Sequence, residues 1–141
     1  MRLATMRSPL PRHRRKLHVA VVSNNPETLD GLERYLQRAG VVTSGTCQID
    51  RSADLGESAS AVVVFPDDFA WEAVVSALTQ CRARNPRALP VVVTQTPQRF
   101  ESLAWPDEGT VPLLVPKPAW SWTILDAIRA HLNDESESES Q

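Results

Sequence analysis

The sequence predicts an α/β protein of three layers, in which a parallel five-stranded sheet lies between two layers of helices. Two observations carry this prediction. Short runs of apolar, mostly valine-rich residues recur five times along the 141-residue chain, as is typical of strands that are buried on both faces. Segments with apolar residues at helical spacing alternate with these runs, and such alternation favours right-handed crossovers and a parallel sheet.

The first half of the chain begins with a strand over residues 17–22, a continuous apolar run. Pro26 follows at the first position of a helix, where its missing N–H is not needed, and Gly40 supplies the left-handed stop. Residues 41–49 are predicted as a second strand, which a glycine weakens. Residues 50–60 are ambiguous, and we expect them to hold one short helix at most.

The second half repeats the alternation three more times. Each strand is again dominated by apolar residues, and prolines end the helices that follow the third and the fourth strand. The last helix carries an apolar stripe with a spacing of three or four residues. The predicted elements are a strand at 61–65, a helix from Trp71 that Pro86 terminates, a strand at 89–93, a short helix between Thr96 and Pro106, a strand at 111–115 and a helix through 124–132.

Proline placement assigns the fifth strand to an edge of the sheet. Pro112, Pro116 and Pro118 share one parity, so in an extended strand their missing N–H groups would all point to the same side. A central strand cannot lose these donors, whereas an edge strand can, and the loss discourages unwanted pairing. The flavodoxin-like strand order 2-1-3-4-5 places the fifth strand at an edge, with ligand sites at the carboxyl ends of the strands.

Charge divides the chain into one domain and two tails. Residues 1–16 carry six cations and no acid, and residues 134–141 carry four acids and no base. Both tails are poor in large apolar side chains, so we expect a disordered basic arm and a disordered acidic tail. Residues 17–133 remain as a single domain, which agrees with a composition of 42% hydrophobic and 23% charged residues.

Several classes of protein are excluded by features that the sequence lacks. No apolar run approaches the roughly 18 residues of a membrane-spanning helix, and the stretch after the basic arm is too short for a signal-peptide core. Cys47 and Cys81 form no CxxC pair, so we expect reduced, buried thiols in a cytoplasmic protein. The histidines lack metal-ligand spacing, and no phosphate loop, HExxH or nucleophile elbow occurs, so we expect no metal and no cofactor.

Polar segments follow the first, third and fifth predicted strands. They are Ser23-Asn24-Asn25-Pro26 after the first strand, Asp67-Asp68 after the third and Lys117-Pro118 after the last. Over residues 17–132 this set resembles the motifs of response-regulator receiver domains. Lys117-Pro118 is the most specific match, and the other two segments stand where receivers carry an acidic cluster and a phosphate-accepting aspartate. The resemblance implies a receiver-like fold and a role in bacterial-type two-component signal transduction.

The positions that handle phosphate in receivers are altered here. Receivers accept a phosphoryl group from a histidine kinase on an aspartate, using a Mg²⁺ held by that aspartate and two acids after the first strand. The corresponding residues are Ser23 and Asn24, which are neutral, so the site should hold Mg²⁺ and a transferring phosphoryl group poorly. The acceptor position falls on Phe65 or Pro66 when counted from the strand end and on Asp67 when counted by spacing.

The positions near the fourth and fifth strands are also changed. The hydroxyl that receivers carry after the fourth strand falls on Gln95 by spacing from Lys117, although Thr94 and Thr96 flank it. The aromatic residue that receivers carry three positions before the lysine is Leu114 here. The resemblance therefore implies a degenerate receiver, or pseudo-receiver, that has lost phosphorylation-driven switching.

Each of these polar residues also has a purely structural interpretation. Asp67 and Asp68 could cap the third helix, and we favour this role over that of a phosphoacceptor. Asn24 and Asn25 are good turn and cap residues in their own right. Lys117 is either a solvated lysine after an edge strand or the partner of one of the two aspartates in an ion pair.

Three tryptophans suggest an interaction surface. Trp120 and Trp122 flank the start of the last helix beside Lys117, and Trp105 could extend the same surface, as could Leu114. Receivers commonly present the fourth helix, fifth strand and fifth helix to partners, and tryptophan is enriched at the energetic centres of interfaces. Two alternatives remain for Trp120 and Trp122: at least one of them anchors a protein partner or a homodimer, or one of them packs on the sheet.

Three functions follow from these patterns. The leading interpretation is an atypical stand-alone receiver-like protein that is no enzyme and acts as a phosphorylation-independent protein–protein interaction module. The second is a working single-domain receiver that is phosphorylated at Asp67 or Asp68. The third is a nucleic-acid-associated protein that acts through the basic arm, although the domain itself is acidic and the arm has no interleaved aromatic residues. No membrane partner is expected.

Overall fold

The computed structural model describes residues 17–103 and 111–139, which form an α/β fold around one parallel sheet. The five strands lie in the order β2-β1-β3-β4-β5, and every adjacent pair is parallel. The predicted fold class and strand order are therefore confirmed. The strands are β1 (His18–Ser23), β2 (Val42–Thr46), β3 (Ala61–Phe65), β4 (Leu89–Thr94) and β5 (Leu113–Pro116).

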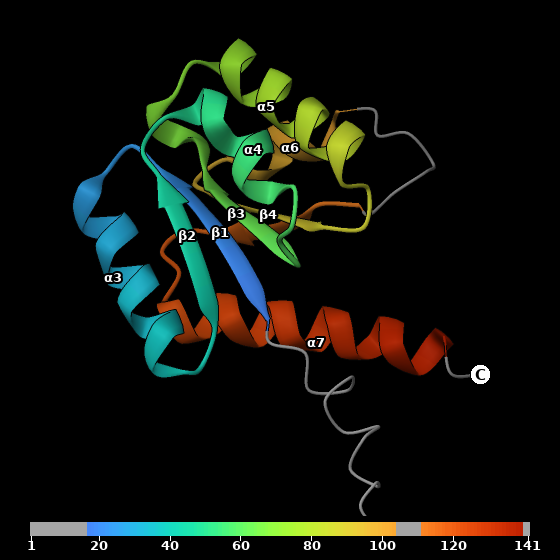
Figure 1. Cartoon of the computed structure of the whole chain (residues 1–141). Coiled ribbons are helices and arrows are strands. Elements are labelled where there is room, and N and C mark those ends of the chain that lie inside the picture. Colours follow the sequence, from blue (N-terminus) through green and yellow to red (C-terminus); the bar gives the residue numbers. More distant parts are fainter. Residues whose placement is uncertain (1–16, 104–110, 140–141) are drawn as a thin grey trace, which may run out of the picture.

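Helices cover both faces of this sheet. They are α3 (Pro26–Arg38), α4 (Ser52–Gly56), α5 (Trp71–Arg84), α6 (Pro97–Glu101) and α7 (Ser121–Glu139), with the 3-10 turns η1 (Ile49–Arg51) and η2 (Pro66–Asp68). Figure 1 shows α3 and α7 on one face and α4, α5 and α6 on the other. The arrangement is the three-layer architecture that the alternating pattern predicts.

Alternating side chains of the central strands divide the core in two. Val21 of β1 packs in a cluster with residues of α3 and α7, whereas its neighbour Val22 packs in a second cluster with residues of α5 and α6. Both valines are fully buried. Because both faces of β1, β3 and β4 are covered, these strands read as continuous apolar runs rather than as alternating ones.

The first helix begins and ends where its flanking residues predict. The Asn25 side chain caps α3 by accepting hydrogen bonds from the backbone N–H groups of Glu27 at 2.9 Å and Thr28 at 3.2 Å. Pro26 occupies the first turn. Gly40, with φ of 85°, turns the chain toward β2 in a conformation that side chains with a Cβ rarely adopt.

The fifth strand lies at an edge of the sheet, as the prolines predict. β5 pairs with β4 alone, and Pro116 lies beside Thr94 in this pairing. The ladder continues through the Lys117 backbone N–H, which donates to the Thr94 carbonyl at 3.0 Å. The N–H groups that β4 needs are thus present, and the prolines weaken the outer edge only.

The second strand is shorter than the predicted span of 41–49. β2 ends at Thr46, whose hydroxyl accepts a hydrogen bond from the Gln48 backbone N–H at 3.1 Å and so starts a turn. The ambiguous segment 50–60 then holds the end of η1 and the single-turn helix α4, in agreement with the expectation of one short helix.

The last helix is longer than predicted. α7 runs to Glu139 and so includes most of segment 134–141, for which the sequence predicts disorder. The segment contains no glycine or proline, and a helix that is already nucleated by a buried apolar stripe extends at little cost through residues such as glutamate. No described helix, α7 included, is both long and apolar enough to cross a membrane. The basic arm, residues 1–16, lies outside the described residues.

Candidate functional site

One carboxylate meets three donors at the carboxyl ends of β3, β4 and β5. The Asp67 side chain, in η2, accepts a hydrogen bond at Oδ1 from the Thr94 hydroxyl at 2.6 Å. Its Oδ2 accepts a hydrogen bond from the Gln95 backbone N–H at 3.0 Å and forms an ion pair with the Lys117 ammonium at 3.1 Å. Asp67 is therefore the centre of the candidate site.

The environment of Asp67 favours its ionised form. Burial raises the pKa of this carboxyl, whose side chain is 24% exposed. The hydrogen bonds from Thr94 and Gln95 and the ion pair with Lys117 outweigh the burial, and they hold the pKa below its ordinary value of 3.8. The carboxylate is thus charged at neutral pH and is balanced by the adjacent ammonium group.

Asp67 enters the site from a turn rather than from the end of a strand. The last residue of β3 is Phe65, which lies beside Ser23 of β1 in the sheet register, and its ring centre is 5.9 Å from the Lys117 ammonium. η2 then carries Asp67 two residues beyond the strand. Of the two ways of locating the acceptor, counting by spacing finds the carboxylate that faces Lys117, whereas counting from the strand end finds a phenyl ring.

Thr94 supplies the hydroxyl of the site. This residue ends β4 and is fully buried, and its hydroxyl oxygen also accepts a hydrogen bond from the Thr96 backbone N–H at 3.1 Å. Gln95, to which the spacing from Lys117 assigns the hydroxyl, has an exposed side chain and contributes its backbone N–H instead. The assignment of the hydroxyl to Gln95 is therefore wrong by one residue, and the flanking Thr94 supplies it.

The end of β1 contributes neutral groups to this edge of the sheet. Ser23 is buried, and its hydroxyl oxygen accepts a hydrogen bond from the Asn25 backbone N–H at 3.1 Å. The Asn24 side-chain amide points toward the Asp68 carbonyl oxygen at 3.5 Å, the outer limit of a hydrogen bond. Asn25 caps α3, so its predicted cap role is confirmed.

The residues of this site do not fit a Mg²⁺ ion. Mg²⁺ requires several hard oxygen ligands and prefers carboxylates. Here the Asp67 carboxylate is already paired with Lys117, and the hydroxyl of Ser23 and the amide of Asn24 carry no charge. Among residues 17–103 and 111–139, no group of three or more His, Cys, Asp or Glu side chains is placed to hold a metal ion.

The interpretation of the two aspartates as helix caps is wrong. α5 begins at Trp71, and its N-cap residue is Ala70, which makes no side-chain cap bond. Asp67 and Asp68 instead lie in η2, three and two residues before the N-cap position. Lys117 is the partner of Asp67 in an ion pair, so the interpretation of Lys117 as a merely solvated lysine is also wrong.

Two tryptophans form an exposed aromatic pair near the site. The rings of Trp120 and Trp122 are stacked, with centroids 5.1 Å apart and an interplanar angle of 2°. They are 62% and 50% exposed, so the alternative that one of them packs on the sheet is wrong. Leu114 is half-buried against the core cluster that faces α5 and α6. Trp105 lies outside the described residues.

Two hollows flank the ends of the strands. One, of about 250 Å³, adjoins Asp67 and is lined by residues of η2, α5 and α6, including Trp71 and Arg99. The Arg99 guanidinium lies 4.0 Å from the centre of the Trp71 ring. The other, of about 260 Å³, lies beside Trp120. Sequence reasoning missed Trp71 and Arg99, because the contact joins two helices that no local pattern brings together.

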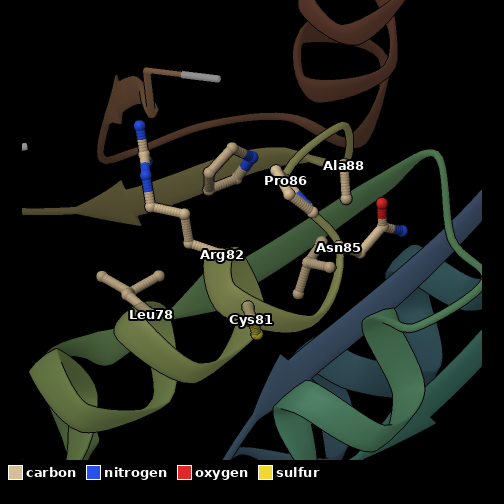
Figure 2. Close-up of a pocket in the computed structure, with 8 residues that line it drawn as sticks. Leu78, Cys81, Arg82, Asn85, Pro86 and Ala88 are labelled. Atoms are coloured by element: carbon tan, nitrogen blue, oxygen red, sulfur yellow. The ribbon is translucent and has the colours of Figure 1, made fainter. Parts of the chain in front are cut away.

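A third pocket lies at the C-terminal end of α5, and its cysteine is not reactive. Figure 2 shows Leu78, Cys81, Asn85 and Ala88 around it. Its volume of about 10 Å³ admits one water-sized group. Burial raises the pKa of the Cys81 thiol to about 11, so the thiol stays protonated and unreactive at neutral pH. The expectation of buried cysteines holds for Cys81 and is wrong for Cys47, which is exposed.

Comparisons with known proteins place the fold. No family model and no curated protein matches the sequence. A response regulator receiver protein from Sinorhizobium medicae is similar in structure, with a TM-score of 0.70 and 16% sequence identity over 84% of this chain and 96% of that one. A signal receiver domain of an HD domain-containing protein from Pseudomonas fluorescens has a TM-score of 0.69 and 16% identity, over 87% of this chain and 99% of that one.

A third similar structure contains a phosphorylated aspartic acid. It is a response regulator protein from Burkholderia pseudomallei with a phosphorylated aspartic acid, a calcium ion and citrate. Its TM-score is 0.64 and its identity 19%, over 88% of this chain and 73% of that one. These likenesses show that the chain has the receiver fold.

Proposed function

We propose that this chain, which has the fold of a response-regulator receiver domain, acts as a phosphorylation-independent protein–protein interaction module in signalling. The observation that carries the proposal is the neutral end of β1, where Ser23 and Asn24 bring a hydroxyl and an amide to this edge of the sheet in place of acids. The Asp67 carboxylate at the same edge is balanced by Lys117.

Phosphoryl transfer to this carboxylate is disfavoured because the end of β1 carries no acidic side chain. A transferring phosphoryl group needs its charge neutralised, usually by a metal ion with further cations. Ser23 and Asn24 supply no charge to hold that metal ion, and Lys117 is already paired with Asp67.

An exposed aromatic surface supports the interaction role. Trp120 and Trp122 present two stacked indole rings to solvent, and the hollow beside Trp120 is lined largely by apolar side chains such as Leu32, Phe65 and Ile124. Indoles in such positions contribute large, rigid contact areas to protein interfaces. The proposal places a protein partner on this surface, and a second copy of the chain is the alternative occupant.

The competing function is a working single-domain receiver, which the contact between Asp67 and Lys117 favours. Incubation with acetyl phosphate and Mg²⁺ followed by intact mass measurement separates the two. The proposal predicts an unchanged mass under conditions that phosphorylate an active receiver in a parallel sample. The addition of one phosphoryl mass that disappears in either Asp67→Asn or Asp68→Asn, and persists in the other variant, would establish the competing function.

The interaction surface is tested by removing the indoles. Affinity capture from the native cell is expected to recover a specific partner with the wild-type chain and to lose it with the Trp120→Ala/Trp122→Ala variant. Val42→Ala is a matched control, since it truncates an exposed apolar side chain on β2, 44% exposed in the structure. Sedimentation of the purified chain tests the homodimer. Equal capture of the partner by the wild type, the double tryptophan variant and Val42→Ala would contradict the role of this surface.

A further inference from the structure

The donors that surround Asp67 converge from two separate connections of the chain. The Thr94 hydroxyl and the Gln95 backbone N–H come from the end of β4, and the Lys117 ammonium comes from the end of β5. We propose that these three groups form an oxyanion cradle, and that the Asp67 carboxylate is its permanent internal occupant. The inference rests on the proposed function, in which this pocket takes no phosphoryl group.

The chemistry of the cradle matches a singly charged oxyanion. A hydroxyl, an amide N–H and an ammonium group all donate, and they meet two oxygens of one anion at 2.6, 3.0 and 3.1 Å. Charge-assisted hydrogen bonds of this kind are stronger than neutral ones. The cradle holds one cation, Lys117, which balances one negative charge, and Thr94 is fully buried while Lys117 is 28% exposed.

The position of Asp67 on the chain explains how an internal anion reaches the cradle. The strand-end residue, Phe65, presents a ring and cannot accept these hydrogen bonds. η2 is closed by a hydrogen bond from the Phe69 backbone N–H to the Pro66 carbonyl at 3.0 Å, and this turn carries the carboxylate two residues further along. The segment after β3 is thereby tied to those after β4 and β5 without any modification of the protein.

Removal of the carboxylate should leave a vacant site for an external anion. In Asp67→Ala, the hydroxyl of Thr94, the amide of Gln95 and the ammonium of Lys117 lose their common acceptor. The adjoining hollow of about 250 Å³, which Asp67 and Gln95 line, gives a small molecule access to them. Acetate, which has the same carboxylate group, is the matched ligand, and inorganic phosphate tests whether a larger oxyanion fits.

The experiment measures the melting temperature of the full chain in sodium acetate and in sodium chloride of equal ionic strength. Asp67→Ala should melt below the wild type in chloride and gain about 3 °C or more in acetate. The wild type, the double variant Asp67→Ala/Lys117→Met and the control Asp54→Ala should show no such gain. Asp54 is a suitable control because it is an exposed aspartate whose side chain pairs with Arg84.

A second signal locates the anion. In NMR spectra of Asp67→Ala, the amide of Gln95 should shift with acetate concentration and saturate. If Asp67→Ala fails to fold in chloride, acetate should restore the folded spectrum. Equal responses to acetate in Asp67→Ala and Asp54→Ala, or no recovery of an unfolded Asp67→Ala, would overturn the cradle. The outcome is independent of the phosphorylation test, because neither a phosphodonor nor Mg²⁺ is present.

Discussion

Replacing Thr94 by valine removes the hydroxyl that holds Asp67 and keeps the shape of a fully buried side chain. The lost contact is a charge-assisted hydrogen bond of 2.6 Å to the carboxylate, and bonds to charged groups contribute about 1.5–3 kcal/mol. The Thr96 N–H also loses its acceptor, but Thr96 is exposed, so water can replace the hydroxyl. We expect Thr94→Val to lower the free energy of unfolding by about 2 kcal/mol.

Urea denaturation followed by circular dichroism measures this loss. Thr79→Val is the matched control, because the Thr79 hydroxyl donates to the Val75 carbonyl on the exposed face of α5, and it should change stability by less than about 0.5 kcal/mol. Thr94→Val and Asp67→Ala should be non-additive by about 1 kcal/mol or more. Additive effects, or a loss in Thr94→Val as small as that in Thr79→Val, would refute the role of this contact.

Three further predictions concern the titration of Asp67, the conformation of two glycines and the reactivity of the two cysteines. Because the folded pKa of Asp67 lies below its ordinary value of 3.8, the stability that the ionised group contributes is present above that value and is lost as the pH falls through the folded pKa. The wild type should therefore have a higher free energy of unfolding than Asp67→Asn at neutral pH, and this difference should disappear in acid. Urea denaturation at several pH values measures it, and a difference that does not change with pH would contradict the prediction. Gly40→Ala should lower the free energy of unfolding by about 1–2 kcal/mol because Gly40 has a positive φ. Gly31→Ala, in the middle of α3 where an added Cβ meets no other atom, should raise it by about 0.5–1 kcal/mol. Urea denaturation measures both changes. Iodoacetamide should modify the exposed Cys47 and spare the buried Cys81, as peptide mass mapping would show.

The fold could be predicted because its strands are buried on both faces. β3 shows this well, since the apolar run at 61–65 coincides with the observed strand. Proline parity placed β5 at an edge for a physical reason, the missing N–H donors. β2 was harder, because an edge strand with a glycine and several hydroxyl side chains has no continuous apolar run. The end of α7 differs from the prediction because a charged composition is typical of disorder, whereas a charged segment can also extend an existing helix.

The candidate site could be predicted only in part. Lys117 and Asp67 were both recognised, and the spacing between them was the useful signal. The roles of the groups depend on local geometry that no spacing reveals. The hydroxyl comes from Thr94, at the end of β4. The donor from Gln95 is its backbone N–H, a group that every residue except proline carries and that a sequence pattern therefore cannot reveal. The prediction that the aspartates cap α5 is wrong because both lie in η2, which ends before the N-cap residue Ala70.

The central claim is that neutral side chains stand where a receiver needs acids to bind Mg²⁺. An NMR titration of the full chain with MgCl₂ tests it most directly, with NaCl at matched ionic strength as the reference. We predict no saturable shift of the Asn24, Gln95 or Lys117 amides at millimolar Mg²⁺, since the Asp67 carboxylate stays paired with Lys117. Saturable Mg²⁺-specific shifts of these amides that disappear in Asp67→Asn would contradict the account.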